Sequence, residues 1–298
     1  MGLDINAVRF LIDARRRGAS FGDVLMLGRQ DLNVYPTKMA QLLASNGFPA
    51  EAFAPQGKDS LFADPVFASL GATSVSAMDV SDFEGASFVH DLNQPIGDEL
   101  RERFDLVYDG GTLEHVFNYP TALRSCMEML RPGGHLFLHT ITNNWCGHGF
   151  YQFSPELFFR TLHPDNGFEV TRMILHAVGP YGRWYEVKDP ESIRSRVELI
   201  TFCPVHLLVQ ARRTRVVPIF QKTPQQSDYT PRWVPSDDAS AGAEKSAPTP
   251  VDYSPSRPRL ARWFPNLARL VHVAKMGLSI YQSHTVRNRK CFQPVKKP

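Results

Sequence analysis

The sequence lacks an apolar run of the roughly 18 residues that a membrane-spanning helix requires. Its first residues, MGLDINAVRFLIDARRR, place an aspartate early and arginines late, the reverse of a secretory signal. Cysteine is scarce: four residues lie far apart with no C-x-x-C pair, so neither a zinc knuckle nor a disulfide framework can be read, and we expect reduced thiols. These absences lead us to expect a soluble, unexported, cytoplasmic protein.

The composition is that of a folded chain with an uneven distribution of charge. Of 298 residues, 43% are apolar and 21% are charged, which excludes a disordered or collagen-like chain. The formal net charge is +3, yet residues 256–298 contain ten lysines and arginines and no acidic residue. The preceding part of the chain is therefore net acidic, and the C-terminal tail is strongly basic.

Residues 1–222 alternate between strand and helix patterns. Short apolar runs predict strands, mostly parallel and buried, at 23–28, 74–79, 87–91, 104–109 and 135–140. Helical spacing and caps predict intervening helices at 36–46, 61–70 and 121–130, and another that opens at Ser154. Two further runs, 174–178 and 206–211, fit an antiparallel pair. The order predicts an α/β fold, a doubly wound, Rossmann-like sheet with an antiparallel edge.

The rest of the chain divides into a linker and a tail. Residues 223–257 are rich in Pro, Ser, Gln, Asp and Ala, which predicts a disordered linker. Residues 258–298 predict a basic amphipathic helix that begins at Pro265. Such a helix can pack back on the domain, lie on an anionic membrane surface or dock on a partner protein. No nucleic-acid module accompanies it, so we expect no nucleic-acid partner.

Acidic residues end three successive predicted strands, where an open α/β sheet binds its ligand. Asp79 closes the second strand, Asp91 the third and Asp109 the fourth. A carboxylate in the second position can accept hydrogen bonds from both ribose hydroxyls, and one in the third can accept from an adenine amine. A single strand-end aspartate is otherwise a turn or cap residue, and Asp82 is an alternative to Asp79.

Three segments carry a family resemblance: FDLVYDGGTLEHV (104–116), LRPGGHLFLHT (130–140) and HGFYQFSPELF (148–158). They resemble class I S-adenosylmethionine-dependent methyltransferases, and the likeness covers roughly residues 20–212. The resemblance implies S-adenosyl-L-methionine as cofactor and methyl transfer to a small-molecule acceptor. It also assigns cofactor contacts: Gly28 beneath the methionine part, Asp79 at the ribose, Asp91 with Leu92 at the adenine, and Asp109 with Gly110 beside the sulfonium.

The first strand departs from the family pattern. The family has a glycine-rich turn of G-x-G-x-G type there, whereas this chain reads LMLGRQDLN and keeps only Gly28. Glycines in such a turn let the backbone approach the ligand. We hypothesise that Arg29 or Gln30 donates to the cofactor carboxylate instead. The alternative is that Arg29 is a surface residue of the loop.

Five side chains are candidates for a catalytic base: His115, Glu114, His148, His139 and Tyr151. His115 follows the fourth strand and His148 the fifth, so both can face an acceptor. Each histidine can equally be a hydrogen-bonded structural residue, and the Glu114-His115 pair can serve only to orient its helix. We assign no metal ligands, because His135 and His139 would be about 13 Å apart on one strand.

The sequence thus predicts methyl transfer to a small polar acceptor, with a sugar or nucleotide-sugar intermediate as a suggestion that no residue fixes. The alternative function is a non-catalytic binding or scaffold protein that keeps the fold after losing the glycine turn. Such a scaffold could associate with a membrane surface through its basic tail.

Overall fold

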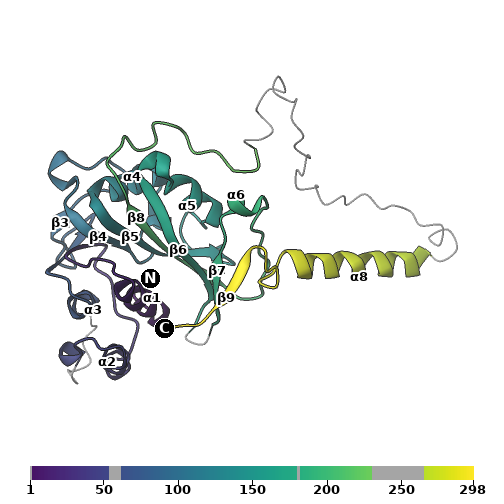
Figure 1. The fold of residues 1–298 in the computed structure, drawn as a ribbon, viewed down its shortest axis with the longest axis horizontal. Helices are drawn as coiled ribbons and strands as arrows, with labels where there is room; N and C mark the ends of the chain where they lie inside the picture. Colours follow the sequence, from purple (N-terminus) through teal and green to yellow (C-terminus); the bar gives the residue numbers. More distant parts are fainter. Residues whose placement is uncertain (1, 54–61, 180–181, 230–264) are drawn as a thin grey trace.

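The computed structural model describes residues 2–53, 62–179, 182–229 and 265–298 (Figure 1). Most of the predicted linker, from residue 230 onward, lies outside these residues. Its first residues are held against the domain: the Ser227 backbone N–H donates to Glu156 over 2.7 Å, and Asp228 pairs with Arg196. These two residues of the predicted linker therefore contact the domain.

One nine-stranded sheet organises the molecule, in the order β3-β2-β1-β4-β5-β8-β6-β7-β9. The first five strands of this order are parallel and the others antiparallel, so the predicted fold class is confirmed. The strands are β1 (Asp23–Leu27), β2 (Ser74–Asp79), β3 (Phe88–Val89), β4 (Phe104–Asp109), β5 (Leu130–Asn143), β6 (Phe168–Ala177), β7 (Trp184–Val187), β8 (Val205–Arg213) and β9 (Phe292–Val295).

Helices cover both faces of the sheet (Figure 1). The α-helices of the described residues are α1 (Ile5–Arg16), α2 (Pro36–Ser45), α3 (Asp64–Ser69), α4 (Tyr119–Met129), α5 (Pro155–Thr161), α6 (Pro190–Ile193) and α8 (Pro265–Ser283), of which α8 does not contribute to this covering. On one face, α4 and α5 bury Leu123 and Phe158 in a common apolar core. On the other, Phe10 of α1 packs edge-to-face against Phe137 and Trp184, with ring centroids 6.0 and 6.2 Å apart. This second core fixes α1 over β5, β6 and β8.

The C-terminal segment differs from the all-helical tail predicted for residues 258–298. Helix α8 begins at Pro265 as expected, but β9 then pairs antiparallel with β7 and extends the sheet beyond the predicted domain limit at residue 222. A strand of four residues with Gln293 and Pro294 at its centre has no apolar alternation to reveal it. Tertiary pairing with β7, rather than local pattern, determines this element.

Helix α8 projects away from the sheet (Figure 1). Apolar side chains along it are exposed: Leu270, Val271, Val273, Leu278 and Tyr281. Within the part of the chain that the structure describes, no helix combines the length and apolarity needed to cross a bilayer. All four cysteines are free, as expected from their spacing.

Candidate functional site

The strand ends of β1, β2 and β4 meet around Gly28, which directly follows β1. Gly28 has a φ of +68°, a conformation that favours glycine. A Cβ built there would lie 3.2 Å from Thr112 Oγ1 and 3.8 Å from Asp79 Oδ2. Thr112 Oγ1 also donates to the Leu27 carbonyl over 2.7 Å, tying the segment after β4 to β1. This is the point in the strand order where the crossovers reverse direction, and ligands of open α/β sheets bind there.

Gln30 fills part of the space between β1 and β4. Its side chain is buried, and its Nε2 donates to the Leu27 carbonyl. A Cβ on Gly110 would overlap Gln30 Oε1, so a larger residue at that position would require the Gln30 side chain to move. The Gln30 side chain therefore stabilises the turn after β1 through this hydrogen bond. This is the turn that has fewer glycines than the family pattern.

Arg29 turns toward the segment before β2 rather than standing alone on the surface. Its guanidinium lies 4.1 Å over the Phe62 ring, 3.5 Å from Asp64 and 3.0 Å from the Glu84 carbonyl oxygen. These contacts occupy the side chain that the sequence suggested for the cofactor carboxylate. Its role at a cofactor stays a prediction.

The two predicted adenosine carboxylates differ in setting. Asp79 ends β2 beside Gly28 and accepts from the Val80 N–H over 2.6 Å. Asp91 is exposed, and hydrogen bonds from the Asn93 backbone and side chain lower the pKa of its carboxyl. Leu92 beside it is buried and offers an apolar contact. Both carboxylates thus lie where the parallel strands end, and Asp79 lies next to the turn after β1.

Asp109 is a buried carboxyl at the end of β4. Its Oδ1 accepts from the backbone N–H groups of Thr112 at 2.8 Å and Leu113 at 3.3 Å. Its Oδ2 has no hydrogen-bond partner among the described residues. Burial raises the pKa of Asp109 to about 6, although these backbone hydrogen bonds oppose the shift.

Three of the five base candidates converge beyond β4. Glu114 is buried, accepts from Thr140 Oγ1 over 3.1 Å and places Oε1 4.0 Å from His148 Nε2. The His115 and His148 rings lie 4.9 Å apart, and 32% of the His148 side chain is exposed. Burial, reinforced by the Asp109 carboxyl, raises the pKa of Glu114 to about 8, whereas burial and His148 lower that of His115. We call these three residues the edge cluster.

The other two base candidates have different roles. The Tyr151 hydroxyl donates to the Phe117 carbonyl over 2.7 Å, which anchors the loop after β5. His139 is buried within β5 and its Nε2 lies 3.0 Å from His206 Nδ1, so it faces the sheet interior beneath α1. Neither side chain joins the edge cluster.

An exposed aromatic pair stands beside the edge cluster. The Phe117 and Phe150 rings pack edge-to-face with centroids 5.7 Å apart and are 71% and 67% exposed. Phe117 follows His115 closely and Phe150 follows His148, so both ends of the pair are anchored next to the two histidines. Exposed aromatic faces of this kind suit contact with a flat apolar ligand.

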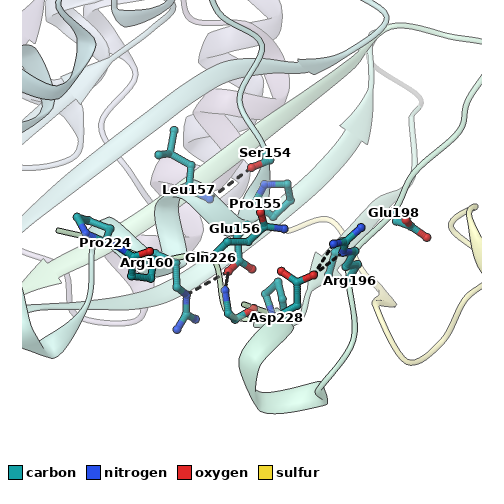
Figure 2. A pocket seen from close by; sticks show the side chains of 14 residues that line it. Ser154, Pro155, Glu156, Leu157, Arg160, Arg196, Glu198, Pro224, Gln226 and Asp228 are labelled. Carbon is teal, nitrogen blue, oxygen red and sulfur yellow. Dashed lines mark hydrogen bonds and ion pairs between the residues drawn. The ribbon is translucent and has the colours of Figure 1, made fainter. Parts of the chain in front are cut away.

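A cavity of about 380 Å³ lies apart from the edge cluster, between α5, residues 196–198 and residues 224–228 (Figure 2). Both arginines of its wall have acidic partners: Arg160 pairs with Glu156 at 3.6 Å and with Asp189 outside the lining, and Arg196 pairs with Asp228. The positive charges are therefore compensated within the cavity wall. Nothing in the sequence pattern indicated this cavity, because segments distant along the chain build it.

Comparison with known proteins connects this geometry to a family. Residues 38–206 match the family described as "Methyltransferase domain". The chain is 28% identical over 111 residues to a ubiquinone biosynthesis O-methyltransferase of Aliivibrio fischeri, covering 37% of this chain and 47% of that protein. It is 32% identical over 101 residues to the protein of the same name in Parvibaculum lavamentivorans, covering 30% and 40%. The chain thus spans less than half the length of these curated relatives.

Solved structures with a similar outline include the N-methyltransferase NodS of Bradyrhizobium japonicum in complex with S-adenosyl-L-homocysteine. That chain is 16% identical with a TM-score of 0.39, and the match covers 72% of this chain and 91% of NodS. A methyltransferase-like protein of Bacillus halodurans is 13% identical with a TM-score of 0.38, covering 68% and 99%. At these values the strand order above, rather than superposition, defines the fold.

Proposed function

Because this chain belongs to the family of methyltransferase domains, as its resemblance to S-adenosylmethionine-dependent enzymes implied, we propose that it transfers a methyl group from S-adenosylmethionine to an oxygen of a small molecule. The observation that carries the proposal is the meeting of Gly28, Asp79 and Asp109 at the reversal point of the sheet. The edge cluster lies beyond it, with Glu114 and His115 on the segment after β4 and His148 in the loop after β5.

The residues at the strand ends fit an adenosine-bearing cofactor. A Cβ built on Gly28 would lie 3.2 Å from Thr112 Oγ1 and 3.8 Å from Asp79 Oδ2. Because Gly28 has none, a ligand can contact the backbone there. Asp79 would accept from the ribose hydroxyls, while Asp91 and Leu92 would flank the adenine. The unpartnered Oδ2 of buried Asp109 would lie nearest the sulfonium. When bound, the cofactor supplies a methyl group already activated by its positively charged sulfur.

His148 is the side chain best placed to remove the acceptor proton. It is partly exposed, whereas Glu114 is buried, with its Oε1 4.0 Å from His148 Nε2. The imidazole would accept the proton that the acceptor hydroxyl gives up as its oxygen takes the methyl group supplied by the cofactor. Alignment of the two reactants provides most of the acceleration, and a well-placed base contributes a further factor of about 10² to 10⁴.

The acceptor we propose is a hydroxyl on an aromatic ring. The curated relatives carry the name O-methyltransferase, and their ubiquinone designation gives no support to the sugar suggested from the sequence. Phe117 and Phe150 add an exposed aromatic surface next to His115 and His148. Such a surface favours a flat apolar ring over a sugar.

Calorimetric titration with S-adenosylmethionine and S-adenosylhomocysteine tests the cofactor site. We expect wild type to bind both, and Asp79→Asn to weaken binding by at least about 1.5 kcal/mol, the cost of a lost charge-assisted contact. Asp82→Asn is the matched control and should bind like wild type. Equal affinities for the two variants would refute the assignment of Asp79.

One observation favours the alternative of a non-catalytic scaffold: the Gln30 side chain is buried between Gly28 and Gly110, close to where a cofactor would bind. The same titration separates the two functions. A well-folded protein that gives no heat with either ligand at high concentration supports the scaffold and excludes the enzyme.

We also propose that α8 contacts an anionic lipid surface. Exposed Leu270 and Leu278 on the helix, together with the ten basic residues of 256–298, support this proposal. Full-length Leu270→Glu/Leu278→Glu should sediment less than wild type with vesicles containing phosphatidylserine. Equal sedimentation of both proteins would exclude lipid contact through these side chains.

A further inference from the structure

Three buried histidines from adjacent strands face one another beneath α1. His176 of β6 is the register partner of His206 of β8, while His139 of β5 pairs with Leu208, two residues farther along β8. Because side chains two residues apart share a face of a strand, all three imidazoles lie on the same side of the sheet. Their ring centroids are separated by 4.8, 5.5 and 6.0 Å.

A carboxylate from α1 completes this group. Asp4 is the N-cap of α1, and its Oδ1 accepts from the backbone N–H groups of Asn6 at 2.9 Å and Ala7 at 2.8 Å. These hydrogen bonds favour its ionised form and still leave carboxylate lone pairs available. One ligand atom from each of Asp4, His139, His176 and His206 can be chosen so that all lie within 4.8 Å of one another. We call these four residues the inner cluster.

Hydrogen bonding leaves ring nitrogens of the inner cluster oriented as ligands. His176 Nδ1 lies 2.9 Å from the Ala177 carbonyl and donates to it, so its Nε2 carries a lone pair. That Nε2 is buried and has no hydrogen-bond partner within the described part of the chain. A backbone carbonyl that fixes one ring nitrogen while the other faces inward is the usual outer-shell arrangement of a metal-binding histidine.

The spacing of the other two imidazoles points the same way. His139 Nε2 and His206 Nδ1 are 3.0 Å apart. Two ligands on one tetrahedral zinc ion, each bonded at about 2.05 Å, are separated by ~3.3 Å. Only small adjustments of the two rings would bring this pair of nitrogens to a common ion.

We propose that Asp4, His139, His176 and His206 bind one divalent transition-metal ion, with zinc as the best match. Three imidazole nitrogens and one carboxylate oxygen form a borderline donor set that suits zinc, and four protein ligands satisfy its tetrahedral preference. Magnesium and calcium prefer an all-oxygen set that these side chains do not provide.

The ion would have a structural role. All three histidines are at most 6% exposed, and the Trp145 ring stacks on His206 with centroids 5.0 Å apart and planes 14° from parallel. A substrate therefore has no direct approach to the imidazoles from that side. The ion would instead join the N-terminus of α1 to β5, β8 and β6, elements distant along the chain.

Metal binding by the untagged, full-length protein tests this proposal. After removal of metal with a chelator and a check of folding by circular dichroism, we expect one equivalent of Zn²⁺ to bind and raise the melting temperature by several degrees. Bound Co²⁺ should give the intense visible absorption of a tetrahedral site, and Zn²⁺ should abolish it. A protein that binds less than about 0.2 equivalents of either ion would overturn the proposal.

Variants locate the site. His176→Gln should lower Zn²⁺ affinity at least tenfold, and Asp4→Asn should do the same without loss of the helix cap, since asparagine caps equally well. His135→Gln, a buried histidine of β5 outside the inner cluster, is the control and should bind normally. If His148→Gln abolished binding while Asp4→Asn did not, the ion would belong to the edge cluster and our assignment would be wrong.

Discussion

The edge cluster and the inner cluster both combine one carboxyl group with histidines, yet they differ in exposure. In the edge cluster Glu114 is buried while 32% of the His148 side chain reaches solvent. In the inner cluster the three imidazoles are buried, and the carboxylate is fixed by backbone N–H groups at a helix N-terminus. A solvent-facing imidazole can exchange protons with a substrate, whereas buried ones with fixed partners suit a permanent ligand. Similar residue types thus support different chemistry.

The largest expected effect is a loss of turnover when the edge cluster is changed, with no change in the inner cluster. His148→Gln should lower kcat by about 10² to 10⁴ with an unchanged dissociation constant for S-adenosylmethionine, because the proton acceptor is lost while cofactor contacts remain. Zn²⁺ uptake and melting temperature should stay at wild-type values. Steady-state kinetics with a phenolic acceptor, together with calorimetry, measures both. A variant with normal turnover would remove His148 from the mechanism.

The next effect concerns stability as a function of pH. The pKa of Glu114 is raised from 4.5 to about 8, so the folded state holds a proton that the unfolded state has released between these values. The contribution of Glu114 to the free energy of unfolding should therefore fall as pH rises from about 4.5 to 8, whereas the buried histidines, whose pKa values are lowered from 6.5, contribute in the opposite sense at the acidic end of this range. Asp109, raised from 3.8 to about 6, adds to the fall only in the lower part of this range.

Glu114→Gln isolates the upper part of that range. Between pH 6 and 8 the free energy of unfolding of wild type should fall relative to that of the variant by on the order of 1 kcal/mol or more, since one pKa unit corresponds to about 1.4 kcal/mol and the histidine contributions are common to both proteins. Urea denaturation at several pH values provides the measurement. Parallel curves for the two proteins would show that Glu114 titrates normally.

The smallest effect tests the connection between the clusters. The Trp145 ring stacks on His206 and also lies 5.4 Å from His148, and its Nε1 donates to the Val205 carbonyl over 3.0 Å. Trp145→Phe keeps an aromatic ring and removes one hydrogen bond, so we expect a loss of about 1 kcal/mol in stability and a change of less than threefold in kcat. A loss of turnover comparable to that of His148→Gln would mean that the two clusters act as one site.

The sequence predicted the parallel half of the sheet more fully than the antiparallel half. Strands such as β1 and β4 contain short apolar runs, and a glycine follows β1 while an aspartate ends β4, which is a local signal. β7 and β9 are four residues each and mix apolar with polar side chains, so they are defined by pairing, of β7 with β6 and of β9 with β7.

Some residues of the candidate site were likewise predicted from local sequence, and others were not. Asp79 and Asp109 were predicted from strand ends, and the structure places both beside Gly28 or its neighbours. Thr112 was missed because a threonine in a loop has no distinguishing pattern until its contact with Leu27 is known. The inner cluster could not be anticipated, since it depends on β8 lying between β5 and β6, a strand order that spacing along the chain does not encode.

The pairing of β9 with β7 also has a consequence for solubility. β9 forms one border of the sheet, and Pro294 within it has no backbone N–H to offer a neighbouring molecule. If β9 detached, β7 would present an unpaired backbone beside Trp184, and copies of the protein could then join strand to strand. By covering the backbone of β7, β9 therefore disfavours self-association of the protein, and this effect is independent of either cluster of histidines.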